Sequence, residues 1–186
     1  MLVPVYWIKY GPQNFLWFCD IALLASVVAL WARSSLIAST QALSVLLFDA
    51  LWSIDFLGSL FVGQSILGLS TFMFDATYPI QLRFLSLFHL WLPWLLLWMV
   101  FRFGYDGRAL AVQTIVCWVV LLVSYLVSTA EENINWVFQL GERDLSLPPT
   151  TYLVLLMIAI PICFYLPAHA LLLRYARSRD IALAAG

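Results

Sequence analysis

Four ionisable residues lie inside long apolar stretches of the sequence: Asp20, Asp49, Asp55 and His89. An ionisable group in membrane hydrocarbon costs about 2.5–3.5 kcal/mol, so we expect each to face the protein interior and to have a partner. At a rise of about 1.5 Å per residue, Asp20, Asp55 and His89 lie about 9, 10 and 15 Å from the same membrane surface. They are therefore predicted to form one polar layer, whereas Asp49 points about 120° away from Asp55 on its helix.

A histidine beside a carboxylate is suited to act as a general base, because the carboxylate orients the ring and stabilises the imidazolium. We predict that His89 is such a base and that Asp20 or Asp55 orients it. The nucleophile is predicted to be Cys19, which precedes Asp20, or a water molecule, with Ser53, Ser59 and Ser86 as other candidates. A cysteine in apolar surroundings is more often inert. The predicted catalytic residues are thus His89, Cys19, Asp20 and Asp55.

Two residues near His89 add to this interpretation. Pro93 follows it by about one helical turn and has no N–H to donate, which leaves the carbonyl oxygen of His89 as an unsatisfied acceptor. Arg83 precedes it and is predicted to hold a lipid phosphate or to pair with an acid. The alternative for Arg83 is a side chain that simply extends to the membrane interface.

Metal binding is the competing chemistry. A catalytic zinc ion usually takes three protein ligands, which His89 could supply together with two of Asp20, Asp49 and Asp55. The sequence has no HxxxH or HExxH spacing. His169 is predicted to lie about 30 Å from the outer surface, too far from His89 to share an ion. We therefore rank direct acid–base chemistry first and expect no cofactor, with zinc as the alternative.

The composition identifies the elements that must position these residues. Of the 186 residues, 64% are hydrophobic and 10% are charged, and the net charge is -1. A soluble domain carries about 25% charged residues, so this chain is predicted to be an integral membrane protein. The composition excludes a disordered chain, and the missing basic footprint argues against nucleic acid as a partner. Its three cysteines lie in apolar runs, which argues against a disulfide framework.

A membrane helix needs about 20 apolar residues. We predict one all-α domain over residues 1–186, a polytopic bundle of five transmembrane helices. These spans are residues 14–32, 36–62, 79–101, 109–128 and 150–173. A six-span bundle, with an additional helix within 51–74, is the alternative.

Basic residues predict the orientation, because they are enriched in cytoplasmic loops. With five spans, one side carries Arg33, Arg102, Arg108, Arg174, Arg177 and Arg179. The other side carries Lys9, Asp75, Glu131, Glu132, Glu142, Arg143 and Asp144. We therefore expect an N-terminus outside and a C-terminus in the cytoplasm, in a plasma or inner membrane.

Several short motifs resemble, in their order, those of the YwaF-like integral membrane proteins: LWFCD (16–20), YP-x3-R (78–83), LSLFH (85–89), GRAL (107–110), ENINWVF (132–138) and YLP (165–167). Relatives of that group include androgen-induced-gene-type lipid hydrolases and a phospholipid acyltransferase branch. The resemblance implies that His89 and Cys19 attack an acyl ester of a membrane lipid. It places Asn133 and Asn135 in an asparagine-rich turn, and with Arg83 they are predicted to bind the substrate.

The chain also departs from this family. It lacks the family's first helix, has additional residues between the second and third spans, and contains Asp49 and Asp55 without a counterpart. A different function thus remains open, namely a non-enzymatic membrane subunit or an oligomeric carrier of protons or a small solute. A third interpretation is that the polar residues only lock helix packing. The sequence does not define the oligomeric state.

Overall fold

The computed structural model describes residues 2–140 and 147–184, and the side chains of 3–140 and 147–178. The described chain is a bundle of helices without β-strands, as the composition predicts. Its elements are α1 (Leu2–Tyr10), η1 (Pro12–Leu16), α2 (Phe18–Ala32), α3 (Ser35–Val62), η2 (Thr71–Met73), α4 (Ile80–Ser86), α5 (Phe88–Phe103), α6 (Ala109–Val127), η3 (Ile134–Trp136), α7 (Pro149–Ile160), η4 (Pro161–Tyr165) and α8 (Leu166–Ala184).

Four helices are long and apolar enough to cross a membrane: Ser35–Val62, Ile80–Phe103, Ala109–Val127 and Pro149–Ser178. The second combines α4 and α5, and the fourth combines α7, the π-helical segment η4 and most of α8. The first predicted span, 14–32, is divided into η1 and the 15-residue helix α2. At about 1.5 Å per residue, α2 is about 22 Å long, shorter than a membrane core of about 30 Å.

The helix ends follow from local chemistry. The hydroxyl of Ser34 accepts the N–H of Ile37 at 3.3 Å and caps the start of α3. Gly63 ends α3 with a φ of 75°, a conformation that glycine adopts without steric cost. Within described residues 63–79 the only helical segment is the short turn η2, so the additional helix of the six-span alternative is not found there.

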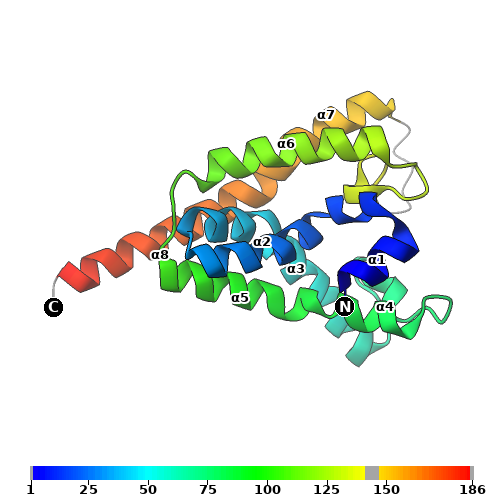
Figure 1. Cartoon of the computed structure of the whole chain (residues 1–186), viewed down its shortest axis with the longest axis horizontal. Helices are drawn as coiled ribbons and strands as arrows, with labels where there is room; N and C mark the ends of the chain where they lie inside the picture. The colour runs from blue at the N-terminus through cyan, green and yellow to red at the C-terminus, as the bar shows by residue number, and fades with distance from the viewer. Residues whose placement is uncertain (1, 141–146, 185–186) are drawn as a thin grey trace.

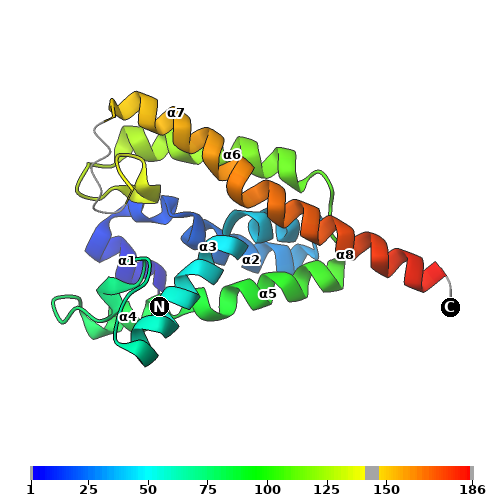
Figure 2. The ribbon, with the colours of Figure 1, turned by 180° about the vertical axis from the view of Figure 1, so that it is seen from behind.

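Helix α3 lies at the centre of the bundle and packs against α2, α5 and α6. Figures 1 and 2 show α5 along one side of the bundle and α6 with the long α7–α8 helix along the other, with α2 and α3 between them. Alanines allow close approach of α2 and α3: Ala22, Ala29, Ala38 and Ala42 are fully buried.

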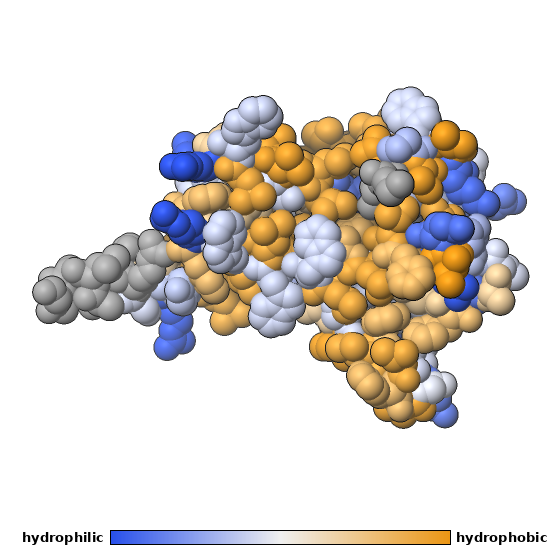
Figure 3. Space-filling model, turned by 60° about the horizontal axis from the view of Figure 1, so that its bottom comes forward, coloured by the Kyte–Doolittle hydropathy of each residue, from blue (hydrophilic) through white to orange (hydrophobic). Residues whose placement is uncertain are grey.

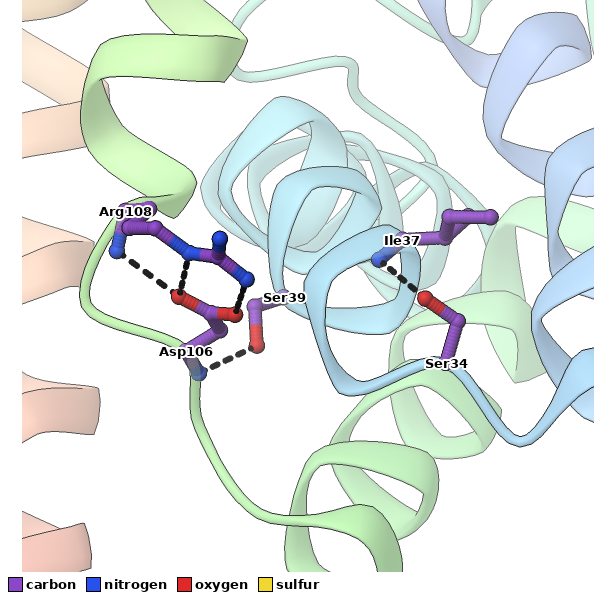
Figure 4. A network of polar contacts seen from close by, with 5 residues as sticks. All are labelled: Ser34, Ile37, Ser39, Asp106 and Arg108. Carbon is purple, nitrogen blue, oxygen red and sulfur yellow. Dashed lines mark hydrogen bonds and ion pairs between the residues drawn. The ribbon is translucent and has the colours of Figure 1, made fainter.

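The two ends of the bundle differ. Figure 1 places the C-terminal helix and the α5–α6 connection at one end, and α1, α4 and the segment after α6 at the other. At the first end the Asp106 N–H donates to Ser39 at 2.9 Å and Arg108 pairs with Asp106 at 2.8 Å (Figure 4). The predicted Glu142, Arg143 and Asp144 lie outside the described residues, as does the side chain of Arg179.

The surface between these ends is apolar. Figure 3 shows hydrophobic residues over the middle of the molecule, with most hydrophilic groups toward the two ends. Large side chains such as Trp31, Trp94 and Leu126 are 89%, 72% and 78% exposed. Exposed apolar surface of this extent is expected where lipid replaces water.

Candidate functional site

A cavity of about 700 Å³ lies in the half of the bundle opposite the Arg108 end. Helix α2 contributes Cys19 and Asp20 to its wall, α3 contributes Asp49, and α5 contributes His89. Helix α1, η1, residues 69–86 and residues 131–136 also contribute to the wall. The structure thus collects in one cavity three of the four predicted catalytic residues, His89, Cys19 and Asp20.

His89 is held by the break between α4 and α5. Because α4 ends at Ser86, the Ser86 carbonyl is free to accept a hydrogen bond, and the Nδ1–H of His89 donates to it at 2.7 Å. Since a carbonyl oxygen only accepts, the proton is on Nδ1, and Nε2 forms no hydrogen bond with the described residues. The ring also stacks on Trp52 and Phe88, at centroid distances of 4.7 and 4.1 Å. The orienting group is therefore a backbone carbonyl, in place of the expected Asp20 or Asp55.

The backbone carbonyl of His89 accepts a hydrogen bond from a neighbouring helix. Pro93 lies inside α5 and donates no hydrogen bond to it. The hydroxyl of Ser53 on α3 donates to this oxygen at 3.4 Å. The acceptor predicted to be unsatisfied thus has a partner in Ser53, and this bond links His89 to the central helix.

Two carboxyl groups line the cavity with unsatisfied oxygens. Asp20 and Asp49 are each 2% exposed. Asp20 accepts one hydrogen bond from Asn14, at 3.1 Å, whereas its Oδ1 has no partner in the described structure. The Oδ2 of Asp49 is likewise buried without a partner there. Buried polar atoms are usually hydrogen-bonded, so these two oxygens have unused capacity to accept hydrogen bonds.

Cys19 lines the same cavity and is half-buried. Loss of hydration in such surroundings disfavours a thiolate. A base such as His89 is therefore needed if Cys19 is to act as a nucleophile.

Asp55 has a different environment from the other predicted catalytic residues. It is fully buried and is not part of the described cavity wall. Its oxygens accept the N–H groups of Ile66, Leu67 and Ser70 at 2.6–2.9 Å, and the hydroxyls of Ser65 and Ser70 at 2.8–3.1 Å. Asp55 thus holds the segment after α3 against the helix, and its expected contact with His89 is not formed.

The predicted substrate-binding residue Arg83 also holds this part of the chain. Its Nη1 donates to the carbonyl of Met73 at 3.2 Å, and its Nε is buried without a partner in the described structure. Arg83 is not part of the described cavity wall. Its guanidinium helps to lower the pKa of Asp75, although the hydrogen bonds from Thr77 contribute more.

The two predicted asparagines shape the segment after α6. Asn133 accepts the N–H groups of Phe138 and Gln139 and donates to the Gln139 carbonyl, so its contacts are local. Asn135 is 5% exposed and lines the cavity. Its Oδ1 accepts the N–H of Phe18 at 3.1 Å, at the beginning of α2. Asn135 therefore positions the helix that carries Cys19 and Asp20.

Tyr6 and Asn14 are polar residues of the cavity wall that were not predicted. Tyr6 donates to the Ser86 hydroxyl at 3.4 Å, since that hydroxyl itself donates to Leu82. Burial raises the pKa of Tyr6 to about 12. Asn14, in the preceding segment η1, donates to Asp20 at 3.1 Å. Tyr6 lies outside every predicted span, and only the return of α1 over the bundle brings it here.

The mouth of the cavity is crossed by a hydrogen bond between distant segments. Gln13 in η1 donates to Glu132 at 2.8 Å, and Glu132 also accepts the Thr129 N–H at 2.8 Å. The hydrogen bond from Gln13, followed by the one from Thr129, lowers the pKa of Glu132. Lys9 and Glu131 also line the cavity, and both are exposed.

The alternative zinc site needs its ligands within reach of one ion. No group of three or more His, Cys, Asp and Glu side chains that could hold a metal ion occurs in the described part of the chain. Asp55, one of the four residues considered, already accepts hydrogen bonds at both oxygens. His169 hydrogen-bonds to Tyr105 at 2.6 Å, outside the cavity wall.

The fold and the cavity together define the class of protein. It is a helical bundle whose helices are long and apolar enough to span a membrane, with a polar cavity between them. Comparisons with protein-family models, with curated proteins and with solved structures found no match for the chain. The functional argument therefore depends on the cavity itself.

Proposed function

We propose that the protein is an integral membrane enzyme that cleaves or transfers an acyl group of a membrane lipid, with His89 as the base. The observation that carries the proposal is the cavity that joins His89, Cys19 and Asp20. A volume of about 700 Å³ is in the range of ligand pockets, about 300–1,000 Å³. The resemblance to YwaF-like proteins supports the same chemistry.

The steps follow from the ring nitrogens of His89. Nε2 takes the proton of the Cys19 thiol while the sulfur forms a bond to the ester carbonyl carbon. The bond between that carbon and the lipid alkoxy oxygen then breaks, and the imidazolium returns the proton to the departing oxygen. Water hydrolyses the thioester to release a fatty acid, or an acceptor hydroxyl takes the acyl group, and either step regenerates Cys19.

The surroundings of Cys19 define an alternative within this mechanism. Because burial disfavours a thiolate, His89 can instead take a proton from a water molecule that attacks the ester directly. Asp20 then stabilises the imidazolium by its charge. Activity that survives in Cys19→Ala but not in His89→Gln would assign the nucleophile to water.

The experiment uses the full chain reconstituted in vesicles of mixed phospholipids, with released fatty acid measured by mass spectrometry. His89→Gln is expected to lower the rate at least about 100-fold, the usual contribution of a general base. His169→Gln, a histidine outside the cavity, should keep the rate, and Cys163→Ala is the matched control for Cys19→Ala. Equal rates in wild type and His89→Gln, or no release by the wild type, would reject the proposal.

The proposed orientation has the cavity at the outer side of a plasma or inner membrane and the C-terminus in the cytoplasm. Its support is the grouping of Arg33, Arg102, Arg108, Arg174 and Arg177 toward the end of the bundle opposite the cavity.

A second function is favoured by one observation, the two unpartnered carboxyl oxygens of Asp20 and Asp49. Intramembrane carboxyl groups also occur in proton paths, so an oligomeric carrier of protons or a small solute is the alternative. A pH-sensitive dye inside vesicles would report proton entry, which Asp49→Asn should abolish. Vesicles that stay impermeable to protons would exclude the proton carrier.

A further inference from the structure

We propose that the cavity is a binding site for an organic ammonium group, held between the carboxyl groups of Asp20 and Asp49. This assignment names the ligand chemistry of the site. An ammonium group would belong to the substrate only if the acyl transfer proposed above is correct, whereas binding itself does not depend on that chemistry.

The first evidence for this binding site is the pair of carboxyl groups of Asp20 and Asp49. Each residue is 2% exposed, and each has one oxygen that is buried without a partner in the described structure. Both residues line the same cavity. Neither forms an ion pair within the described part of the chain, where Arg108 and Asp106 pair at the other end of the bundle. A positively charged ligand would give these two carboxyl groups the partner that their buried oxygens do not have among the described residues.

The second evidence for this binding site is the charge of the whole cavity wall. Its acidic residues are Asp20, Asp49, Glu131 and Glu132, and its basic residue is the exposed Lys9. The wall therefore favours a cationic group over a free anion.

The third evidence for this binding site is the set of aromatic rings that line the same cavity. Trp17 and Trp136 meet edge to face in the wall, with centroids 6.4 Å apart and an interplanar angle of 82°. Tyr6 and Phe72 also line the cavity. A cation over such a face gains about 0.5–2 kcal/mol. Trp52 contributes less, because Phe56 and His89 stack on it.

The two carboxyl groups, the acidic wall and the aromatic rings together favour an alkylated ammonium ligand over a metal ion. A small hard cation needs several oxygen ligands at short range, and no such cluster occurs in the described residues. An alkylated ammonium instead fits apolar rings with few hydrogen bonds. It has two sources, the head group of an amine-containing phospholipid and a free amine.

Choline and 3,3-dimethylbutanol, its uncharged carbon isostere, provide the test of charge. Their binding to the full chain is measured by calorimetry in nanodiscs of phosphatidylglycerol, a lipid without an amine. Choline is expected to bind at least about tenfold more tightly, the factor for one charge-assisted interaction. Equal binding of both compounds, or binding of neither together with no lipid preference, would overturn the proposal.

Native mass spectrometry separates the two sources. The protein is extracted from vesicles of equal phosphatidylcholine and phosphatidylglycerol, and the retained lipid is identified. Preferential retention of phosphatidylcholine would support the site with a lipid head group as its source, and choline binding without this preference would support it with a free amine.

Isosteric variants assign the residues. Asp20→Asn and Asp49→Asn are each expected to weaken choline binding at least about tenfold. Asp106→Asn, the matched control at the other end, should bind normally. Unchanged binding in both cavity variants would overturn the proposal. Wild-type protein that binds choline but releases no fatty acid would reject the acyl transfer and leave the ammonium site standing.

Discussion

The side-chain oxygen of Asn135 lies 3.1 Å from the backbone nitrogen of Phe18 and accepts its hydrogen bond. The amide nitrogen of Asn135 donates to the Leu16 carbonyl at 2.7 Å and to the Ser124 hydroxyl at 3.2 Å. One side chain thus joins η1, the beginning of α2 and the end of α6. Since Cys19 and Asp20 are in the first turn of α2, this residue controls where they lie.

Asn135→Ala should therefore destabilise the protein although Asn135 is proposed neither as base nor as nucleophile. The substitution leaves the Phe18 N–H and the Leu16 carbonyl without their partner, at about 1–3 kcal/mol for each buried group. Alanine is also strained at the φ of 53° that Asn135 adopts. The free energy of unfolding should fall by about 2 kcal/mol or more.

Thermal unfolding of the purified chain in detergent measures this effect. Gln13→Ala, which removes one exposed hydrogen bond on a neighbouring segment, is the control and should change stability by about 0.5 kcal/mol or less. Equal melting temperatures for wild type and Asn135→Ala would contradict the positioning role.

Asp55→Asn should loosen the segment after α3 more than it affects the cavity. An asparagine keeps one acceptor oxygen, but its NH2 group would face N–H and O–H donors that now have a carboxylate partner. Amide hydrogen exchange at Ile66, Leu67 and Ser70 should become faster while the bundle stays protected. Asp49→Asn is the comparison on the same helix and should leave these amides unchanged. Loss of turnover with unchanged exchange would instead indicate that Asp55 acts in the reaction.

Asp49 and Asp55 also show how far the sequence determines the site. Helical periodicity correctly separates their directions by about 120°, and composition correctly predicts an apolar helical bundle. Periodicity does not indicate which of the two faces the cavity. That depends on residues 65–70 folding back onto α3 and filling the hydrogen-bonding capacity of Asp55, an arrangement between distant segments. His89 and Asp20 were found because ionisable residues stand out in apolar helices, whereas Tyr6 does not stand out in an interfacial segment.

The bond between Gln13 and Glu132 should make the mouth of the cavity sensitive to acid. Because the pKa of Glu132 is lowered in the folded protein, its carboxylate contributes stability at neutral pH that is lost as pH falls below the ordinary value of about 4.3. Protonation weakens its hydrogen bond to Gln13, so η1 and the Thr129 segment should separate. Quenching of tryptophan fluorescence by acrylamide should increase over this range, since Trp17 and Trp136 lie in these segments.

Glu132→Gln is the matched variant for this acid effect. It keeps the shape of the side chain but does not titrate, so quenching should no longer change with pH in this range. A pH profile identical to that of the wild type would mean that another group opens the mouth.

Cysteine labelling in intact cells should establish which end of the bundle faces the cytoplasm. Ala76 lies in the exposed segment beside the cavity, and Ser178 is exposed on α8 at the other end. With Cys163 replaced by serine, Ala76→Cys should react with a membrane-impermeant maleimide, and Ser178→Cys should react only after the cells are opened. The reason is that the Ser178 end carries most of the arginines, which are retained on the cytoplasmic side. The reverse pattern would place the cavity on the cytoplasmic side, so that any lipid or amine it binds would come from the inner leaflet or the cell interior.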